Sequence, residues 1–300
     1  MLVDQRNFSM LEFAGRRLTL GGPPAASQPA DADPGLDQAI EVEIDAFSLA
    51  DRCVSAGDFY AFLSEVSGGG LDHTQIDCID PCFIVHRAGG FALRPGCADF
   101  PMIQISFWAA AAYCNWLSRV EGLAAVYDVA ARAADLDLDG YRLPTEAEWE
   151  AACWQGHPDG ALPAPDRCNS ADAGPTCRAL RAGAAGAGNF VPGQPGPVPV
   201  AALPADAAGL YGMLGNLREW CQDRYASYSA AGYSSASHSS SASGGVLPLR
   251  NPRGASRGAF RVVRGGSFID PAAGLGPASR LAAFEDTRCE VYGFRVARAR

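Results

Sequence analysis

Three cysteines and one histidine lie close together in the first third of the chain, at Cys78, Cys82, His86 and Cys97. Thiolate and imidazole groups are the usual ligands of structural zinc, so these residue types suit a zinc ion. Their spacing, Cys-x3-Cys-x3-His-x10-Cys, is not one of the standard zinc spacings. We therefore favour buried free thiols, or a disulfide in an exported protein, and keep zinc as the alternative.

The chain has ten cysteines among its 300 residues. Residues 1–6 contain no basic segment followed by an apolar run, and no stretch of the chain is long enough to span a bilayer. These features predict a cytoplasmic protein with reduced thiols. Cys114 and Cys153 are expected in the core because they lie on apolar faces of predicted helices. Cys168 and Cys177 are close enough in sequence to form a bridge under oxidation.

The net charge limits the classes of partner. The chain carries 33 acidic residues against 24 Lys and Arg, which gives a net charge of -9. Such a chain repels nucleic acid and anionic membrane, so neither is expected as a partner. A protein or a small molecule remains.

Hydrophobic patterns predict short strands and helices joined by long loops. Strands are expected at 8–20, 40–47, 260–268 and 292–297, and helices are expected to begin at Ser55, Ser106 and Thr145. Ser106 is the expected N-cap of its helix, and Thr145 with Glu148 has the spacing of a capping box. Many glycines and prolines between these elements indicate a loop-rich α+β fold.

Three stretches lack a sustained hydrophobic period. A mobile loop is expected at about 22–38, and the serine-rich stretch at about 226–245 is expected to be a surface loop. Residues 161–207 are rich in Ala, Gly and Pro and are expected to form coil.

Four segments of the chain, taken together and in this order, resemble the formylglycine-generating-enzyme (sulfatase-modifying factor) family. They are Ala112 to Leu117, Gly140 to Glu150, Gly209 to Trp220, and Arg264 to Phe268 with Gly293 to Arg295. The resemblance implies one domain over residues 1–300 with a C-type-lectin-like fold. That fold has small antiparallel sheets, about three helices, and N- and C-terminal strands that lie together. The aromatic residues in these segments are expected to be core.

Enzymes of this family that make formylglycine resemble one another in a pair of cysteines that binds copper. The pair lies shortly after the Gly-Gly-Ser turn. In this chain the matching loop, residues 269–280, contains no cysteine, and none occurs between Cys221 and Cys289. The carboxylate of Asp270 is a poor substitute for soft thiolates. Copper is therefore not expected. The iron-dependent branch of the family uses a histidine triad, but this chain has only four histidines and no His-x3-His spacing.

The resemblance then implies a divergent member, for which we expect a non-catalytic module that binds a ligand or a protein. Variable proteins of diversity-generating retroelements belong to this branch and display side chains between the Gly-Gly-Ser turn and Gly-Phe-Arg. The ligand-binding candidates here are Ile269, Asp270, Leu275, Arg280, Glu285, Glu290 and Tyr292. The alternative is an oxidoreductase acting on a substrate other than a sulfatase, with Asp270, Arg280 and Glu285 as its pocket.

Calcium is the metal that the resemblance still allows. Its ligands would be Asn216 and Glu219, and Asn169 with the carbonyl of Ser170, since hard oxygen atoms suit Ca²⁺. The other interpretation is that Asn216 and Glu219 hydrogen-bond backbone groups and fix a turn, and both remain open. At Asn169 the structural interpretation is favoured because no partnering acidic residue is evident downstream.

Overall fold

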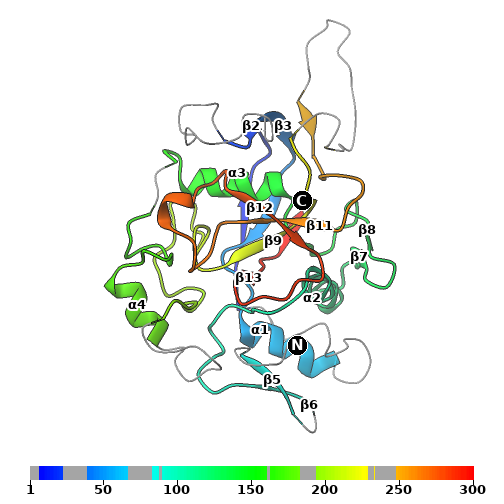
Figure 1. Ribbon diagram of the computed structural model, residues 1–300. Coiled ribbons are helices and arrows are strands. Elements are labelled where there is room, and N and C mark those ends of the chain that lie inside the picture. The colour runs from blue at the N-terminus through cyan, green and yellow to red at the C-terminus, as the bar shows by residue number, and fades with distance from the viewer. Residues whose placement is uncertain are drawn as a thin grey trace, which may run out of the picture.

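The fold is taken from a computed structural model, which describes residues 7–22, 39–66, 83–87, 90–160, 163–182, 194–228, 233 and 248–300. Most of the two loops predicted at 22–38 and 226–245 lies outside these residues, as do Cys78 and Cys82. Figure 1 shows the arrangement of the elements.

The described residues contain four α-helices, which are α1 (Ala56–Val66), α2 (Phe107–Val120), α3 (Glu146–Gly156) and α4 (Pro175–Ala182). The first three begin where the sequence predicts. The Ser106 hydroxyl accepts a hydrogen bond from the Ala109 N–H, and Thr145 and Glu148 form the capping box. The prediction of coil over the whole of 161–207 is wrong, because α4 lies inside that stretch and starts at Pro175, a residue suited to the first helical position.

Within the described ranges the strands are short and form three small sheets and two hairpins. The first sheet has the order β12 (Arg280–Phe284), β11 (Phe260–Arg264), β9 (Arg218–Arg224), β13 (Tyr292–Gly293). The second is β1 (Met10–Phe13), β4 (Phe47–Ala50), β14 (Ala297–Ala299), and the third is β10 (Leu249–Arg250), β3 (Ile40–Ile44), β2 (Arg16–Leu20). The hairpins are β5 (Ile84–Arg87) with β6 (Gly90–Leu93) and β7 (Tyr127–Asp128) with β8 (Ala133–Ala134).

The sheet that contains β9 and β11 separates two apolar clusters. Successive side chains of a strand point to opposite faces, so Val263 and Trp220 pack into the cluster under α1 and α2. Val262 and Cys221 pack into the other cluster, together with α3. Figure 1 shows α3 on one side of this sheet and α1 and α2 on the other. The sheet is therefore fixed from both faces.

The expected meeting of the two chain ends is confirmed. Strand β4 pairs with β1 on one side and with β14 on the other, both antiparallel, so that Leu49 lies between Leu11 and Ala297. The predicted strand at 8–20 is two strands, β1 and β2, and β2 pairs with β3. The α+β, loop-rich, C-type-lectin-like fold is thus confirmed. Within the described part of the chain, no helix has both the length and the apolar character needed to cross a membrane.

Candidate functional site

A turn of two glycines leads the chain out of β11 and into the segment that was expected to carry the site. Gly265 and Gly266 have φ of +92° and +70°. A Cβ atom on Gly265 would lie 2.6 Å from the carbonyl oxygen of Met213, so this turn requires glycine. The chain continues through Asp270 and a short 3-10 helix (Ala272–Gly274) and returns as β12. The segment therefore forms the wall of a recess over β11.

This recess is a pocket of about 300 Å³. Its lining residues are Arg218, Val263, Gly266, Asp270, Pro271, Gly274, Leu275, Ser279, Arg280 and Leu281. Three of the predicted ligand-binding residues, Asp270, Leu275 and Arg280, thus meet in one pocket. None of the ten lining residues carries sulfur, and a soft thiolate is what Cu(I) requires, so the pocket does not fit copper.

Asp270 is held at the mouth of the pocket by three partners. One carboxylate oxygen accepts a hydrogen bond from the Arg218 guanidinium. The other oxygen accepts from the backbone N–H of Ser267 at 2.8 Å and from its hydroxyl at 2.9 Å. The side chain of Asp270 is still 24% exposed, so a ligand in the pocket would meet an ion pair.

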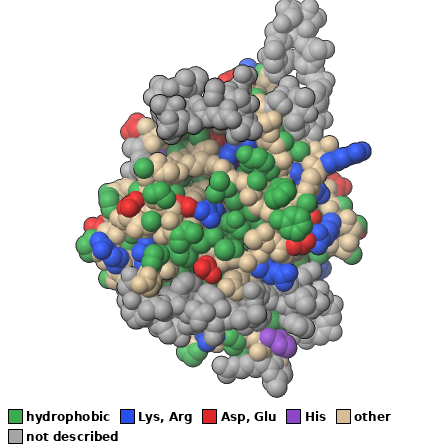
Figure 2. All heavy atoms as spheres, in the orientation of Figure 1, with side chains coloured by type: hydrophobic (Ala, Val, Ile, Leu, Met, Phe, Trp, Pro, Cys, Tyr) green, Lys and Arg blue, Asp and Glu red, His purple; other side chains and the backbone are tan. Residues whose placement is uncertain are grey.

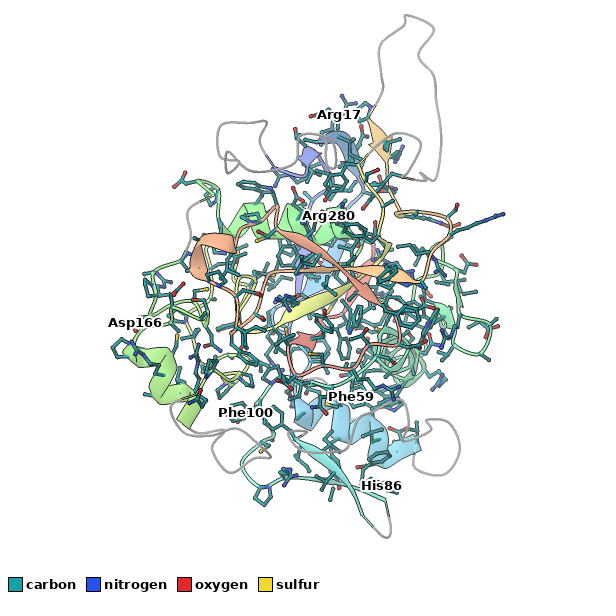
Figure 3. The ribbon with its side chains drawn as sticks, viewed as in Figure 1. Arg17, Phe59, His86, Phe100, Asp166 and Arg280 are labelled. Atoms are coloured by element: carbon teal, nitrogen blue, oxygen red, sulfur yellow. The ribbon has the colours of Figure 1, made fainter. Side chains whose placement is uncertain are left out.

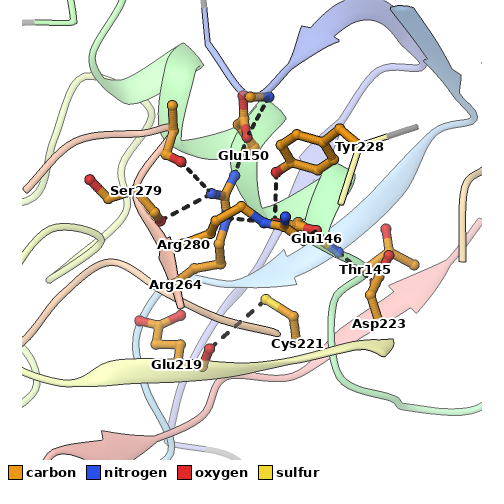
Figure 4. A network of polar contacts seen from close by, with 12 residues as sticks. Thr145, Glu146, Glu150, Glu219, Cys221, Asp223, Tyr228, Arg264, Ser279 and Arg280 are labelled. Carbon is orange, nitrogen blue, oxygen red and sulfur yellow. Dashed lines mark hydrogen bonds and ion pairs between the residues drawn. The ribbon is translucent and has the colours of Figure 1, made fainter. Parts of the chain in front are cut away.

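Arg280 forms the inner wall. Its guanidinium donates to both oxygens of Glu146, at 2.7 and 3.0 Å, and lies 4.0 Å from the ring centre of Tyr228 (Figure 4). The positive charge of Arg280 is therefore balanced beneath the pocket by a fully buried carboxylate. Arg280 therefore lines the pocket, but its charge is already paired with Glu146.

The other predicted ligand-binding residues take three different positions. Ile269 is 50% exposed beside the pocket, and Tyr292 is half-buried with the Arg218 guanidinium 6.0 Å from its ring centre. Glu290 is exposed and does not line the pocket. The placement of Glu285 in the pocket is wrong. Glu285 follows the last residue of β12, and its carbonyl accepts from the N–H of Phe107 at the start of α2.

Glu285 is held by ion pairs with arginines outside the pocket. Its carboxylate contacts Arg261 at 3.1 Å and Arg132 at 3.2 Å, and the residue is 4% exposed. Asp270 and Glu285 therefore do not form the carboxylate pair that the oxidoreductase hypothesis needs.

Large apolar side chains are exposed on β11, on β12 and beside the pocket. Phe260, Ile269, Leu281 and Phe284 are 53%, 50%, 50% and 44% exposed. The rings of Phe260 and Phe284 contact one another edge to face, with centroids 6.0 Å apart. Figure 2 shows hydrophobic side chains gathered over this face of the molecule. We call these four residues the apolar patch.

A network of buried charges lies under β11 and β12 (Figure 4). A carboxylate oxygen of Glu146 accepts a hydrogen bond from the Tyr228 hydroxyl at 2.8 Å. The backbone N–H of Glu146 donates to the carboxylate of Asp223 at 2.7 Å. Asp223 is fully buried beside Glu146, and this burial raises its pKa to about 8. Asp223 is therefore protonated at neutral pH.

Asp223 makes the stability of the protein depend on pH. Between its ordinary pKa of 3.8 and about 8, the folded protein holds a proton that the unfolded chain releases. Raising the pH through this window must therefore lower the free energy of unfolding, by at most about 1.4 kcal/mol per pH unit from this group. The Asp223→Asn variant is expected to lose this slope, which urea denaturation at several pH values between about 5 and 8 measures. Parallel pH curves for the variant and the wild type would contradict the assignment.

The side chains through which the resemblance allows calcium to bind are hydrogen-bonded to protein groups. Glu219 is fully buried, and its two oxygens accept from the Arg295 guanidinium at 2.6 and 2.7 Å. The indole N–H of Trp149 donates to the same carboxylate at 2.8 Å. Asn216, with φ of +61°, instead accepts from the N–H of Val198 at 2.9 Å. Asn216 and Glu219 thus face different partners and do not fit one shared ion.

The second place where the resemblance allows calcium, at Asn169 and Ser170, has the same character. The side-chain oxygen of Asn169 accepts from Nε of Arg181 at 2.8 Å, and the carbonyl of Ser170 accepts from Nη2 of Arg181 at 2.5 Å. A guanidinium therefore stands where a metal would bind. Sequence reasoning missed Arg181. It predicted that Arg218 pairs with a carboxylate inside the fold but not that it lines the pocket. Pro175 at the start of a short Arg-containing segment was the available signal for the helix that carries Arg181.

The cysteine predictions have mixed outcomes. Cys114 and Cys153 are buried in the core as expected, and Cys168 and Cys177 are free and buried. Of the four possible zinc ligands, Cys97 is buried and His86 lies exposed on β5, far from Arg280 (Figure 3). No cluster of three or more metal-ligating side chains occurs among the residues that the structure describes.

Comparison with known proteins places this geometry in a family. Residues 14–300 match the model of the sulfatase-modifying factor enzyme 1-like domain. The chain is 27% identical over 260 residues to the serine/threonine-protein kinase pkn1 of Chlamydia caviae, which covers 86% of this chain and 34% of that protein. It is 28% identical over 173 residues to the formylglycine-generating enzyme of Mus musculus, covering 57% of this chain and 36% of that protein. The chain thus spans about a third of the length of these curated relatives.

Two solved structures are similar in fold. Treponema denticola variable protein 1 superposes with a TM-score of 0.64 at 21% identity, covering 97% of this chain and 95% of that chain. PvdO from Pseudomonas aeruginosa gives a TM-score of 0.61 at 19% identity, covering 97% and 94%. With a family model that matches almost its whole length, the chain belongs to the family of sulfatase-modifying factor enzyme 1-like domains.

Proposed function

We propose that this protein is a non-catalytic module that binds an extended peptide segment of a partner protein along strand β12. The observation that carries the proposal is the combination of an edge strand, a pocket at one end of it and an exposed apolar patch around both. In the relatives that make formylglycine the corresponding loop is the place of chemistry. In this chain we propose that the matching segment and strand β12 bind a peptide instead.

The backbone of β12 supports this mode of binding. Among the residues that the structure describes, β12 is the last strand of its sheet, and it pairs with β11. The carbonyl of Phe260 accepts from the N–H of Tyr225, beyond β9, so the backbone groups of Phe260 point away from β12. Because backbone groups alternate along a strand, Arg261 directs its N–H and carbonyl toward β12, where it pairs with Ala283. It follows that Ala282 directs its N–H and carbonyl away from the sheet. An unpaired edge of this kind accepts an added strand.

The side chains supply the contact area and the selectivity. Exposed large apolar side chains that cluster on a surface mark sites of protein association. Leu281 and Phe284 lie on β12 itself, and Phe260 contacts Phe284 from β11. The neighbouring pocket of about 300 Å³ has room for one side chain of a bound peptide. Its walls combine apolar atoms of Val263 and Leu275 with the Arg218–Asp270 ion pair, which favours a side chain with a polar end.

An oxidoreductase receives less support from the same geometry. That hypothesis relies on Asp270 and Glu285 sharing a pocket, but Asp270 lines the pocket whereas Glu285 does not and pairs with Arg261 instead. Retroelement diversification is a narrower form of the binding proposal. An adjacent reverse-transcriptase gene with a template repeat of the segment 269–292 would support it, and the similarity to the Treponema denticola variable protein is one of fold.

The proposal is tested by selecting peptides from a random displayed library on the purified protein. Selected peptides are expected to bind Leu281→Asp at least about tenfold more weakly than wild type, because an introduced charge must be desolvated in the apolar patch. Ala202→Asp adds the same charge at an exposed position outside the patch and is expected to leave binding unchanged. Fluorescence anisotropy with labelled peptides measures both. Equal affinity for the wild type and Leu281→Asp would contradict the proposal, as would stoichiometric copper binding with oxygen consumption.

A second variant separates backbone pairing from side-chain contact. Ala282→Pro removes an N–H that faces away from the sheet, and proline is tolerated at such edge positions. We expect the thermal midpoint to change little while peptide affinity falls by at least about tenfold, since one strand-pairing hydrogen bond and its neighbours are lost. Unchanged affinity would show that the peptide does not pair with β12.

A further inference from the structure

Arg181, near the end of α4, extends its side chain into the protein and is 8% exposed. Its Nε donates to the side-chain oxygen of Asn169 at 2.8 Å, and its Nη2 donates to the carbonyl oxygen of Ser170 at 2.5 Å. Asn169 and Ser170 are both fully buried. One cation is thus shared by a side-chain amide oxygen and an adjacent backbone carbonyl, which are ligand types that Ca²⁺ takes in proteins.

The orientation of the Asn169 side chain is set by hydrogen bonds other than those to Arg181. The amide nitrogen of Asn169 donates to the side-chain oxygen of Asn216 at 3.0 Å and to the carbonyl of Gly196 at 3.0 Å. These two bonds leave the amide oxygen pointing toward Arg181. Burial lowers the pKa of Arg181, yet a guanidinium stays protonated in proteins, so the positive charge persists.

The segment held by Arg181 reaches the pocket. The N–H of Ala171 donates to the carbonyl of Asp270 at 2.8 Å, and the carboxylate of Asp172 accepts from the N–H of Ala272 at 2.8 Å. The guanidinium therefore stabilises a coil that in turn contacts the pocket wall. The backbone carbonyl of Asn169 also accepts from the backbone N–H of Asn216 at 2.7 Å, which ties the same coil to the turn before β9.

We infer that Arg181 is a built-in structural cation, which occupies the place between Asn169 and Ser170 where the family resemblance suggests calcium. The chain consequently needs no metal ion there. A guanidinium that is covalently part of the chain cannot be removed by a chelator or replaced by a competing metal.

Thermal denaturation of the purified protein tests this inference. For the wild type, the midpoint is expected to stay within error when calcium is added or when a calcium chelator is present. Arg181→Ala is expected to lower the midpoint by about 5 °C or more, because two buried acceptors lose their charged donor. Adding guanidinium ion at low millimolar concentration, or calcium, is expected to raise the midpoint of this variant, because either cation fills the vacated place.

Arg178→Ala is the matched control, since Arg178 lies on the same helix and is exposed. It is expected to change the midpoint by no more than about 1 °C and to show no response to guanidinium or calcium. A wild-type midpoint that falls on chelation would overturn the inference, and this result does not depend on any variant folding. Equal midpoints for Arg181→Ala and Arg178→Ala would also overturn it. So would a destabilised Arg181→Ala that neither cation stabilises, because the segment would then need the helix and not the charge.

Discussion

Arg295→Met is expected to lower the free energy of unfolding by about 3–5 kcal/mol, because it leaves the carboxylate of Glu219 buried without its counter-charge. Both residues are fully buried, and Arg295 donates to both oxygens of Glu219. Arg295 also donates to the carbonyl of Ala50 at 3.1 Å and to that of Tyr211 at 2.9 Å. The substitution therefore removes the residue that joins β4, the turn before β9 and the segment after β13. Urea denaturation measures the loss.

The matched control is Arg300→Met, which breaks the ion pair with Glu12 at the surface. Both side chains of that pair are at least half exposed, so a loss of no more than about 0.5 kcal/mol is expected. Adding Glu219→Gln to Arg295→Met is expected to recover part of the stability, since the uncompensated charge disappears. A loss equal to that of the control would show that the buried pair contributes nothing.

Arg264→Met is the second large effect, expected at about 3 kcal/mol or more and accompanied by loosening of the pocket wall. The Arg264 guanidinium pairs with Glu150 and donates to the carbonyls of Ala278 and Ser279 at 2.9 and 3.0 Å (Figure 4). Without Arg264, the carbonyls of the pocket segment lose their donor. Amide hydrogen exchange in residues 276–279 is therefore expected to quicken more than the global loss of stability explains.

The loss in Arg264→Met also has a predicted pH dependence. Burial raises the pKa of Glu150 even with Arg264 present, and removing the guanidinium must raise it further. The folded variant then holds a proton that the unfolded chain releases, so its stability falls as the pH rises above the ordinary carboxyl pKa. Arg257→Met, at an exposed position in the same part of the chain, is the control and is expected to show neither effect. A pH-independent loss would contradict the role given to Glu150.

Local signals in the sequence predicted much of the fold. The helix starts at Ser106 and Thr145 follow from side-chain caps that act within three residues, and such signals need no tertiary context. Strand β12 was missed because Arg280 to Phe284 has only weak alternation, and its pairing with β11 is decided by the apolar cluster beneath. Helix α4 was missed because its composition resembles that of the surrounding Ala-rich coil.

The candidate site was predicted only in part from the sequence. The segment after the Gly-Gly turn was the expected location, and Asp270, Leu275 and Arg280 do line one pocket. Glu285 was misplaced because its carboxylate pairs with Arg261 and Arg132, which lie 24 and 153 residues away in sequence, so no neighbouring residue signals its position. Arg181 was missed because its helix was not predicted. The place of Arg218 in the pocket was missed because its partner Asp270 lies 52 residues away, and pairing of this kind is a property of the assembled fold.

The position of β4 has a consequence for how the protein forms during synthesis. Strand β4 lies between β1 and β14, so its sheet cannot be completed until residues near 299 have left the ribosome. Such long-range pairing slows folding, because the entropy of closing a large loop must be lost before the contacts form. The nascent chain will therefore expose β4 and its apolar neighbours until β14 has been synthesised. A chaperone that binds extended apolar segments has its longest opportunity there.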